Sequence, residues 1–435
     1  MSAGAARSAV GGPAGAAIPR RPGGAREVAY WLGRRLLLPV ARAHRRRLRD
    51  TLVVAITGSA GKTTTKNLVR AVLAETGPGT ASPGSRNRAK GLVQVLARTR
   101  RHHRFSVHEV AACGPGTLDE LLWTLEPEVG VVTTVGREHY TAFRGLDAVA
   151  REKAKVVQAL PPDGLAVLDA DQPLVRAMAG ETAARVLLVG RSPDADLRAE
   201  AVRAGWPEPL AFEARWDGQR VAVATRLFGE HWLPAVLSAL AVGVGAAGLT
   251  LAEAAAALAR SEPERHRLSE ARLPGGVTFL EDDWKAPTWS LDSAFEVLRT
   301  ARARRRILVL GRLSDDPKNA RQLYRRVVRR ALEAADVVVA VGRSSDYLEA
   351  RADGRLHAFA TAAECHRFLA GFLAAGDLVL VKSGAGHEHL ERLVLARQEG
   401  MACWRHACGR RLWCHDCRLR WSAEPAPRAP GGLPR

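Results

Sequence analysis

The segment that most constrains the fold is residues 53–69, VVAITGSAGKTTTKNLV. In this segment a continuous apolar run passes through a glycine-containing turn into a helical pattern. Runs that are apolar on both faces are typical of parallel sheets, whose strands are connected by helices. The segment therefore predicts the first strand, turn and helix of an α/β domain.

The turn in this segment has the composition of a phosphate-binding loop. At a helix start, backbone N–H groups can cradle phosphates, Lys62 can reach the β- and γ-phosphates, and the Thr63 hydroxyl can hold Mg²⁺. The alternative is a glycine turn that only starts a helix, but strand, G-x-x-G-K-T and helix stand in the required order. The usual loop has a further glycine where this chain has Ile56. The predicted nucleotide-binding residues of the loop are Gly58, Ser59, Ala60, Gly61, Lys62, Thr63 and Thr64.

Further apolar runs, separated by helical stretches, follow the loop. One series precedes the segment SEPERHR (261–267), which we expect to be a hinge, and a second series follows it. We therefore expect an α/β fold with a doubly wound parallel sheet of the P-loop type, followed by a smaller Rossmann-like α/β domain. The expected strands after the first are 105–112, 129–135, 164–171 and 184–190, then 276–283, 304–311, 336–342 and 377–384.

The two ends of the chain differ from this α/β body. Residues 1–50 combine an apparently structureless start with a basic, apolar-faced segment, residues 26–50, that is interrupted by Pro39. The segment could lie on an anionic membrane through Trp31 and residues 36–38, but packing on the following domain is the favoured alternative. The expected domains are 51–262 for nucleotide binding, 263–398 for the Rossmann-like domain, and 399–435 for a Cys-rich knuckle with a disordered tail.

The net charge of +20 comes from basic residues scattered along the whole chain, which argues against a nucleic-acid partner. Only eight of the 65 basic residues are lysines, so a surviving lysine marks a place where a compact, reactive amine matters. The chain has no apolar run of about 20 residues and no signal-peptide core. We expect a cytoplasmic protein, with the basic segment as its candidate for peripheral membrane or protein contact.

Three polar residues follow the loop at the ends of expected elements. Glu109 ends the strand FSVHEV, where its carboxylate would lie beside the loop at the carboxyl edge of the sheet. His139 stands in GREHYTAF, after the next strand, and Lys153 stands in the helical LDAVAREKAKVVQAL. Each residue alone has an ordinary structural explanation, so the signal is their order after a phosphate-binding loop.

These ordered motifs resemble the Mur ligases, ATP-dependent enzymes that add amino acids or peptides to cell-wall precursors, and above all the D-alanyl-D-alanine-adding branch. AITGSAGKTTTK is similar to the family's T-G-T-x-G-K-T-T-T loop, which also lacks the first glycine. REKAKVVQALPPDGLAVLDADQ resembles the stretch from the family's carbamylated lysine to its N-A-D turn. FGEHWLPAVLSALA, RHRLSE and LEDDWKAPTWSLDSAFEVL resemble three later motifs. The resemblance covers residues 51 to 395.

The resemblance implies a reaction in which a carboxylate attacks the γ-phosphate of ATP and an amine then displaces phosphate from the acyl phosphate. It implies that Thr63 and Glu109 hold one Mg²⁺ and that His139 and Lys153 hold another. A protonated lysine cannot bind a cation, but its CO₂ adduct is an anionic oxygen ligand of the kind Mg²⁺ prefers. Lys155 is the alternative if the register is displaced by two residues.

Other site residues are also implied by the resemblance alone. Asn87 and His231 correspond to nucleotide-side positions, and Arg267 at the hinge and Asp283 in the second domain are expected to complete the catalytic site when the domains close. The implied partners are therefore a carboxylate substrate and an amino-acid or peptide amine. The lysine of the loop, Lys62, is the remaining catalytic residue.

The sequence departs from the family pattern at several positions. Thr133 and Thr134 replace asparagines before the histidine, and Trp232 and Ala235 replace asparagines near the nucleobase. Arg88, Lys285 and Pro287 depart from two further motifs. Only about 50 residues precede the loop, so the family's UDP-binding N-terminal domain is not expected here, and a UDP-linked substrate is not implied.

Two other functions remain open from the sequence. A Mur-like protein without catalytic activity could bind nucleotide and a partner, which the substituted nucleobase-side residues leave possible. A P-loop kinase or motor ATPase would explain the loop but not the Lys153 segment or the second domain.

Four of the six cysteines crowd together after residue 400. Cys403, Cys408, Cys414 and Cys417 have the spacing C-x4-C-x5-C-x2-C. Four soft ligands that include a C-x-x-C pair suit tetrahedral Zn²⁺, although the loops are tighter than in a usual zinc ribbon. A redox or iron–sulfur role and unliganded thiols are the alternatives.

Overall fold

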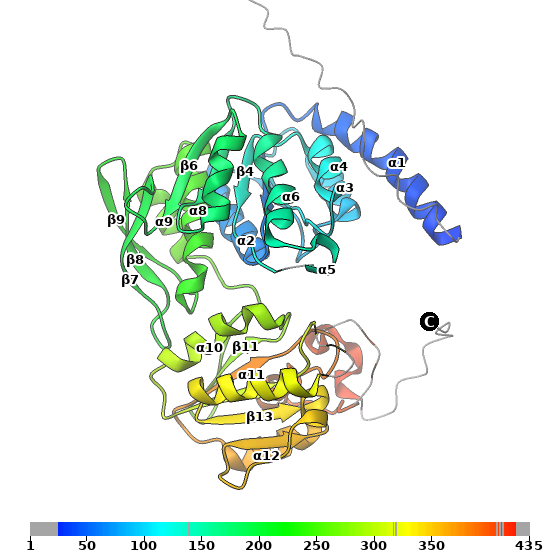
Figure 1. The fold of residues 1–435 in the computed structure, drawn as a ribbon, viewed down its shortest axis with the longest axis vertical. Coiled ribbons are helices and arrows are strands. Elements are labelled where there is room, and N and C mark those ends of the chain that lie inside the picture. Colours follow the sequence, from blue (N-terminus) through cyan, green and yellow to red (C-terminus); the bar gives the residue numbers. More distant parts are fainter. Residues whose placement is uncertain are drawn as a thin grey trace, which may run out of the picture. The chain divides into compact units, whose positions relative to one another are not determined.

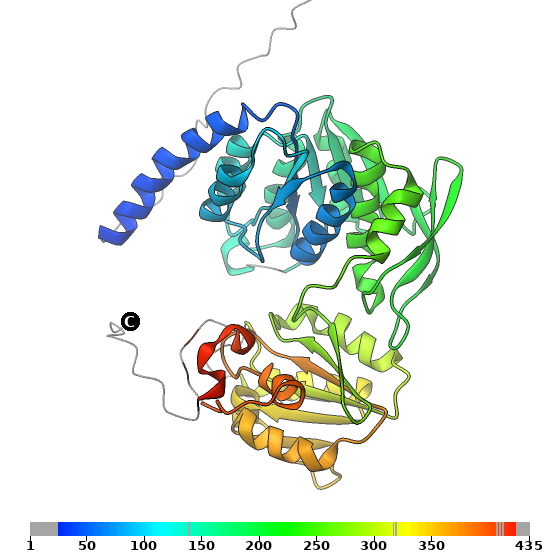
Figure 2. The same cartoon turned by 180° about the vertical axis from the view of Figure 1, so that it is seen from behind.

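A computed structural model of the 435-residue chain describes residues 25–137, 140–315, 317, 320–405, 408, 410 and 413–422 (Figures 1 and 2). The chain forms two compact units. The first unit contains residues up to 200 with 213–223 and 233–258, and the second contains 201–212, 224–232 and the residues from 259 onward.

The first sheet is parallel from β2 through β7, in the order β2-β3-β1-β4-β5-β6-β7-β8-β9. The middle strands β1, β3, β4 and β5 are almost wholly buried, as their continuous apolar runs predict. The strands are β1 (Leu52–Thr57), β2 (Gly79–Ala81), β3 (Phe105–Glu109), β4 (Val129–Val132), β5 (Leu165–Asp169), β6 (Arg185–Gly190), β7 (Leu197–Arg203), β8 (Ala211–Trp216) and β9 (Gln219–Ala224).

Helices cover both faces of this sheet, which confirms the predicted doubly wound α/β fold. Apolar side chains of α3, α4 and α6 pack with Val53 and Ala55 of β1, whereas α2 and α8 pack together against other strands, with Gly243 of α8 close to Val72 of α2. The helices are α1 (Ala25–Arg45), α2 (Lys62–Leu73), α3 (Ala89–Arg98), α4 (Thr117–Leu125), α5 (Tyr140–Phe143), α6 (Leu146–Gln158), α7 (Pro173–Arg176), α8 (Leu233–Ala246) and α9 (Leu251–Ala259).

The basic N-terminal segment forms the single helix α1, and the expected interruption at Pro39 does not occur. Pro39 is exposed, so water can bond the carbonyl group that loses its partner. Leu38 and Ala41 are buried in the core of the first unit, and Arg45 Nε donates to the carbonyl of Leu125 at 2.8 Å. The end of the helix therefore packs on the nucleotide-binding domain. None of the helices among the described residues has the length and apolar character needed to cross a membrane.

The second sheet has the order β10-β11-β15-β12-β13-β14, with β10 antiparallel to β11 and the other pairs parallel. Its core joins the apolar residues of these strands to those of α12 and α13. The strands are β10 (Ser269–Leu273), β11 (Val277–Asp282), β12 (Arg305–Leu310), β13 (Val337–Val341), β14 (Leu356–Phe359) and β15 (Asp377–Lys382). The helices are α10 (Leu291–Thr300), α11 (Arg321–Ala334), α12 (Ala362–Phe372) and α13 (Arg392–Gln398).

The Cys-rich segment, of which the structure describes 401–405, 408, 410 and 413–422, packs on the second unit. Trp404 lies against the core of the second sheet, and the backbone N–H groups of Ala402 and Cys403 donate to the carbonyl of Arg420 at 3.0 Å. Two short 3-10 helices, η6 (Cys414–Asp416) and η7 (Arg418–Trp421), end the described part of the segment.

Candidate functional site

The loop between β1 and α2 has the backbone geometry of a tight strand-to-helix turn. Gly61, which caps α2, has φ 75°, and Gly58 has φ 150°. A Cβ atom on Gly58 would lie 1.8 Å from Thr133 Oγ1, so no other residue fits there without displacing the neighbouring strand end. The loop therefore requires glycine at both predicted positions.

Two threonines after β4 brace this loop. Thr133 Oγ1 donates to the carbonyl of Ala60 at 2.6 Å, and Thr134 Oγ1 accepts from the N–H of Ala60 at 3.0 Å. The N–H of Ser59 donates to the Thr134 carbonyl at 2.9 Å. Two of the backbone N–H groups predicted to cradle phosphate therefore bond to Thr134 in this structure. Thr133 and Thr134, which stand where the family pattern has asparagines, thus have a structural role at the loop.

Lys62 lies at the start of α2 and is buried over its own loop. Its Nζ donates to the carbonyl of Gly58 at 2.5 Å and is 3.4 Å from that of Ser59. Carbonyl oxygens satisfy a buried ammonium group, but each is a weaker partner than a phosphate anion. The lysine is thus held at the loop that was predicted to bind phosphate. Thr64, the next residue after Thr63, is also buried in the first turn of α2.

A carboxylate, a hydroxyl and an amide meet behind the loop. Glu109 pairs with Ile56 in the parallel β1–β3 register, which places it at the carboxyl end of β3. Its carboxylate accepts hydrogen bonds of 2.8 Å from Thr63 Oγ1 and from Asn87 Nδ2. The Glu109 side chain is only 3% exposed. The family resemblance predicted Thr63 and Glu109 as Mg²⁺ ligands and Asn87 as a nucleotide-side residue, and the structure brings the three side chains together.

The oxygens of this group fit Mg²⁺. A carboxylate and a hydroxyl are hard oxygen ligands of the kind that Mg²⁺ prefers. The two hydrogen-bond donors to Glu109 are both neutral, so they leave its negative charge for a cation. The oxygen atoms of Glu109 and Thr63 are therefore chemically suited to bind the predicted Mg²⁺.

Two lysines of α6 differ in how far they are buried. Lys153 is 1% exposed, one of the most deeply buried large side chains. Lys155 Nζ forms ion pairs with Asp119 at 2.8 Å and with Glu152 at 3.0 Å. Burial opposes the charge on Lys155, but hydrogen bonds to Asp119 and Glu152 raise its pKa. Because only a neutral amine reacts with CO₂, Lys155 is the weaker candidate for a carbamate, and Lys153 remains the prediction.

His139 lies outside the described residues, so its predicted metal role is not placed; α5 begins at Tyr140. Near the end of β4, Gln172 Nε2 donates to Asp169 Oδ2 at 2.8 Å and to the Thr133 carbonyl at 3.4 Å. Burial raises the pKa of Asp169 above its ordinary value. Gln172 therefore links the residue after β4 that braces the loop, Thr133, to the end of β5.

A second lysine of α2 also braces the nucleotide-binding domain. Lys66 Nζ donates to the carbonyls of Ser82 at 2.5 Å and Gly84 at 2.7 Å. The hydroxyl of Ser82 in turn accepts the backbone N–H of Glu109 at 3.3 Å. The sequence analysis missed Lys66, although its survival in an arginine-biased chain was a usable signal.

The hinge arginine has an unusual backbone on both sides. Arg267 stands between His266 and Leu268, whose φ angles of 65° and 55° are rare for residues with a side chain. Such conformations persist only where the surrounding structure fixes them. They are found most often at functional sites. His266 Nδ1 bonds Asp283 Oδ1 at 2.8 Å, so the structure connects the neighbour of Arg267 with the other residue predicted in this domain.

Two acidic side chains, Asp283 and Glu281, lie at this hydrogen bond. Burial raises the pKa of Asp283, and His266 lowers it only in part. Burial likewise raises the pKa of Glu281, whose carboxylate is 4.0 Å from His266 Nδ1, to about 7. His231, in the segment of the second unit before α8, is half-buried, and its desolvation lowers the pKa to about 4. Nothing in these contacts places His231 on a nucleotide.

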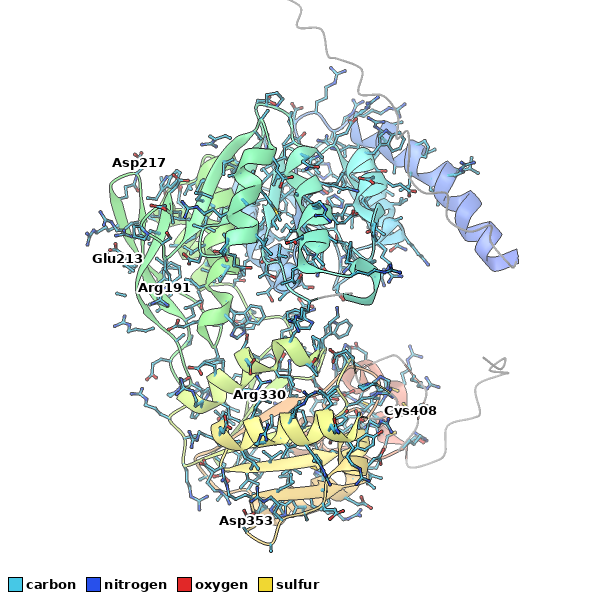
Figure 3. All side chains as sticks on the ribbon, viewed as in Figure 1. Arg191, Glu213, Asp217, Arg330, Asp353 and Cys408 are labelled. Carbon is cyan, nitrogen blue, oxygen red and sulfur yellow. The ribbon has the colours of Figure 1, made fainter. Side chains whose placement is uncertain are left out.

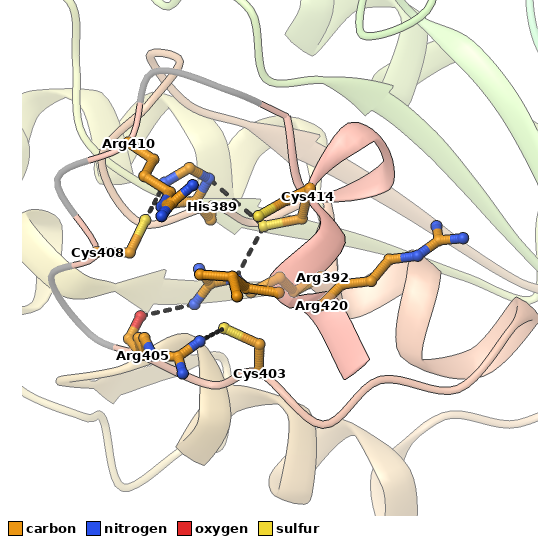
Figure 4. Close-up of a pocket in the computed structure, with 10 residues that line it drawn as sticks. His389, Arg392, Cys403, Arg405, Cys408, Arg410, Cys414 and Arg420 are labelled. Atoms are coloured by element: carbon orange, nitrogen blue, oxygen red, sulfur yellow. Dashed lines mark hydrogen bonds between the residues drawn. The ribbon is translucent and has the colours of Figure 1, made fainter. Parts of the chain in front are cut away.

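The four cysteines predicted to bind zinc all line one pocket of the second unit. Figure 3 labels Cys408, which lies in this segment, and Figure 4 shows the pocket itself. The pocket is also lined by His389, from the loop after β15, and by arginines of the C-terminal segment and α13. The sequence analysis did not include His389.

The comparisons with known proteins match two successive stretches of the chain. Residues 56–243 match the Mur ligase middle domain, and residues 266–385 match the Mur ligase glutamate ligase domain. The chain is 34% identical over 301 residues to the UDP-N-acetylmuramoyl-tripeptide–D-alanyl-D-alanine ligase of Mycobacterium bovis, covering 67% of this chain and 59% of that protein. The chain thus spans about three fifths of the length of this curated relative.

Solved structures show the same fold. A crystal structure of MurF from Acinetobacter baumannii matches with a TM-score of 0.75 at 23% identity, covering 83% of this chain and 79% of that one. A MurF ligase from Thermotoga maritima in complex with ADP matches with a TM-score of 0.70 at 20% identity, covering 81% and 80%. Because the two family matches together span more than half of the chain, the protein belongs to the Mur ligase family.

Proposed function

We propose that this chain is an ATP-dependent carboxylate–amine ligase that forms amide or peptide bonds through an acyl phosphate. The observation that carries the proposal is the group behind the loop, where Thr63 and Asn87 each donate to the buried carboxylate of Glu109 at 2.8 Å. A bare glycine turn needs no buried carboxylate beside the helix start. The ligase names of the relatives and the ADP complex of the Thermotoga structure support the same chemistry.

The proposed reaction has two steps. A carboxylate oxygen attacks the γ-phosphorus of ATP, the bond from that phosphorus to the bridging oxygen breaks, and ADP leaves. The nitrogen of the amine then bonds to the acyl carbon, the carbon–oxygen bond to the phosphate breaks, and the nitrogen loses a proton. Both steps depend on positioning and charge neutralisation more than on covalent chemistry by the protein.

The residues of the first unit divide these tasks. Lys62 exchanges its loop carbonyls for the phosphates and neutralises their charge. Thr63 and Glu109 would hold Mg²⁺, which supplies further charge neutralisation at the phosphates when bound. Lys153, once modified by CO₂, would hold a second Mg²⁺ together with His139. The carbamate would supply an oxygen ligand and the imidazole a nitrogen ligand. Arg267 and Asp283 keep their proposed catalytic roles in the second unit.

The substrates are proposed by class. The relative from Mycobacterium bovis is named for a UDP-N-acetylmuramoyl-tripeptide and D-alanyl-D-alanine. We propose a peptidyl carboxylate and an amino-acid or dipeptide amine, in cell-wall or peptide-polymer synthesis. ATP and Mg²⁺ are the proposed cofactors.

A direct assay tests this proposal. Purified protein is mixed with Mg²⁺, ATP and pairs of peptidyl carboxylates and amines, with D-alanyl-D-alanine among the amines, and the release of ADP and phosphate is measured. The expected result is release that requires both substrates and is lost in Lys62→Ala. If no pair stimulates release while ATP still binds, the chain is a nucleotide-binding protein without ligase activity.

We also propose that the C-terminal cysteines bind a structural Zn²⁺. The support is that Cys403, Cys408, Cys414 and Cys417 line one pocket although up to 14 positions separate them in the chain. Zinc content measured on protein purified in reducing buffer tests this directly. A metal-free protein that takes up no added zinc would refute it.

For localisation, we propose a cytoplasmic protein that contacts a membrane surface through α1. Leu36, Leu37 and Val40 are exposed on this basic helix, whereas Leu38 and Ala41 are buried. Exposed apolar residues on a basic helix are typical of interfacial binding. Co-sedimentation with anionic vesicles should fall in Leu37→Asp, and equal sedimentation of both proteins would contradict the proposal.

A further inference from the structure

The pocket around the C-terminal cysteines has a wall formed by the loop after β15 and by α13. His389 lies in the loop after β15, before α13, and lines the pocket with all four cysteines. Figure 4 shows the His389 ring between Cys408 and Cys414. Among the described residues, His389, Glu391 and Cys414 also offer ligand atoms within 4.8 Å of one another. A metal in this pocket would therefore be reached from the domain as well as from the C-terminal segment.

The two nitrogens of His389 have different partners. Nδ1 lies 3.0 Å from Glu391 Oε1 and 3.7 Å from Cys414 Sγ, and Nε2 lies 3.2 Å from Cys408 Sγ. A carboxylate holds the proton on Nδ1, which leaves the lone pair of Nε2 directed at the cysteine. Histidines that bind metals usually have this arrangement, with a carboxylate on the second nitrogen. On a tetrahedral zinc, nitrogen and sulfur ligands lie roughly 3.5 Å apart, close to the separation observed here.

Two arginine side chains donate hydrogen bonds to cysteine sulfur atoms of the pocket. Arg392 is only 2% exposed, and it donates from Nε to Cys414 Sγ at 3.1 Å and from Nη1 to the Arg405 carbonyl at 2.6 Å. A buried guanidinium needs a negative partner, which metal-bound thiolates supply. Arg405 Nη1 likewise donates to Cys403 Sγ at 3.0 Å. Arg392 is thus placed as a hydrogen-bond donor to Cys414, and Arg405 as a donor to Cys403.

We propose that one Zn²⁺ is bound by His389 Nε2, Cys408, Cys414 and Cys417, with Cys403 outside the ligand set. The inference rests on the zinc proposed above and changes its ligands, because His389 replaces Cys403. Figure 4 places Cys403 beside Arg405, across Arg392 from the labelled His389 and Cys408. Cys414 and Cys417 form the C-x-x-C pair, the spacing with which two thiolates chelate one zinc.

This ligand set gives the metal a mechanical role. The ion ties the C-terminal segment to the domain that carries His389. Trp413, next to the ligand Cys414, stacks on His266 with ring centroids 3.6 Å apart and an angle of 4° between the planes. Since His266 adjoins Arg267 and bonds Asp283, the metal would hold the aromatic ring that supports the hinge.

The experiment uses the full-length chain, zinc analysis and substitution by Co²⁺. Wild type should bind one zinc per chain, and His389→Ala and Cys408→Ser should lose it, whereas Cys403→Ser and the control Cys113→Ser should keep it. His389→Cys should regain metal, which separates loss of a ligand from misfolding. In the cobalt-loaded protein, sulfur-to-metal charge transfer should have the strength of three thiolates. A cooperative urea unfolding curve with wild-type secondary structure by circular dichroism confirms that each variant has folded.

Three results would overturn the inference, and each is distinct. A four-thiolate cobalt spectrum with metal lost in Cys403→Ser and kept in His389→Ala would restore the four-cysteine set. Absence of zinc uptake by wild type would refute both the ligand set and the zinc itself. Removal of zinc should also speed hydrogen exchange in the peptide around Trp413 and in that around His266, and unchanged exchange near His266 would refute the hinge support.

Discussion

Replacing Glu109 with glutamine removes a negative charge from the proposed Mg²⁺ site and keeps the shape of the side chain. The carboxylate accepts one hydrogen bond from Thr63 Oγ1 and one from Asn87 Nδ2, both of 2.8 Å. A glutamine can accept from Asn87 and donate to the Thr63 oxygen, so both contacts survive. We therefore expect the free energy of unfolding to change by less than about 1 kcal/mol. The Mg²⁺ affinity should fall at least about tenfold, or about 1.4 kcal/mol.

The assay pairs urea unfolding with calorimetric titration of ATP at a series of Mg²⁺ concentrations. Glu152→Gln is the matched control, since Glu152 is also a buried glutamate but accepts the backbone N–H groups of Gly116 and Leu118, each at 2.9 Å. The substitution also removes the ion pair of Glu152 with Lys155. In the variant, the N–H group of the new amide faces a backbone N–H group, which should lower the free energy of unfolding by about 1–3 kcal/mol. The Mg²⁺ dependence of ATP binding should stay the same. An unchanged Mg²⁺ dependence in Glu109→Gln would refute the reasoning.

Three other substitutions test separate parts of the account. Lys153→Arg should abolish ADP release that depends on added bicarbonate, because a guanidinium forms no carbamate, and Lys155→Arg should retain it; equal loss in both would contradict the assignment. Gly58→Ala sets a Cβ 1.8 Å from Thr133 Oγ1 and should lower the free energy of unfolding by about 1–3 kcal/mol in urea, less so when combined with Thr133→Ala. Burial raises the pKa of Glu281 from 4.5 to about 7, so its contribution to stability is complete below pH 4.5 and is lost as the pH rises to 7. Glu281→Gln should therefore lose less stability than wild type over that range, and parallel unfolding curves would contradict this.

The fold class follows from the sequence because the central strands are continuous apolar runs. The runs at 51–57 and 377–384 contain the buried strands β1 and β15 almost residue for residue. The edge strands were missed for the opposite reason. β9 exposes alternate side chains, β2 has three residues, and β10 runs antiparallel at a sheet edge, so none carries a strong apolar run.

The grouping of Thr63 and Glu109 could be predicted since parallel strands bring their carboxyl ends to the same edge. The bracing by Thr133 and Thr134 could not, because a side-chain hydroxyl that bonds a neighbouring loop leaves no periodic pattern in the sequence. His389 was missed for a similar reason, since it precedes the cysteine cluster and meets it only through the fold.

The central claim is that an acyl phosphate forms, and the fate of the carboxylate oxygen tests it most directly. The carboxylate substrate that supports ADP release is labelled with oxygen-18 in both oxygens, and the released phosphate is analysed by mass spectrometry. The account predicts that every phosphate carries one labelled oxygen from the substrate. Unlabelled phosphate, with its new oxygen taken from water, would show plain ATP hydrolysis and would contradict the ligase mechanism.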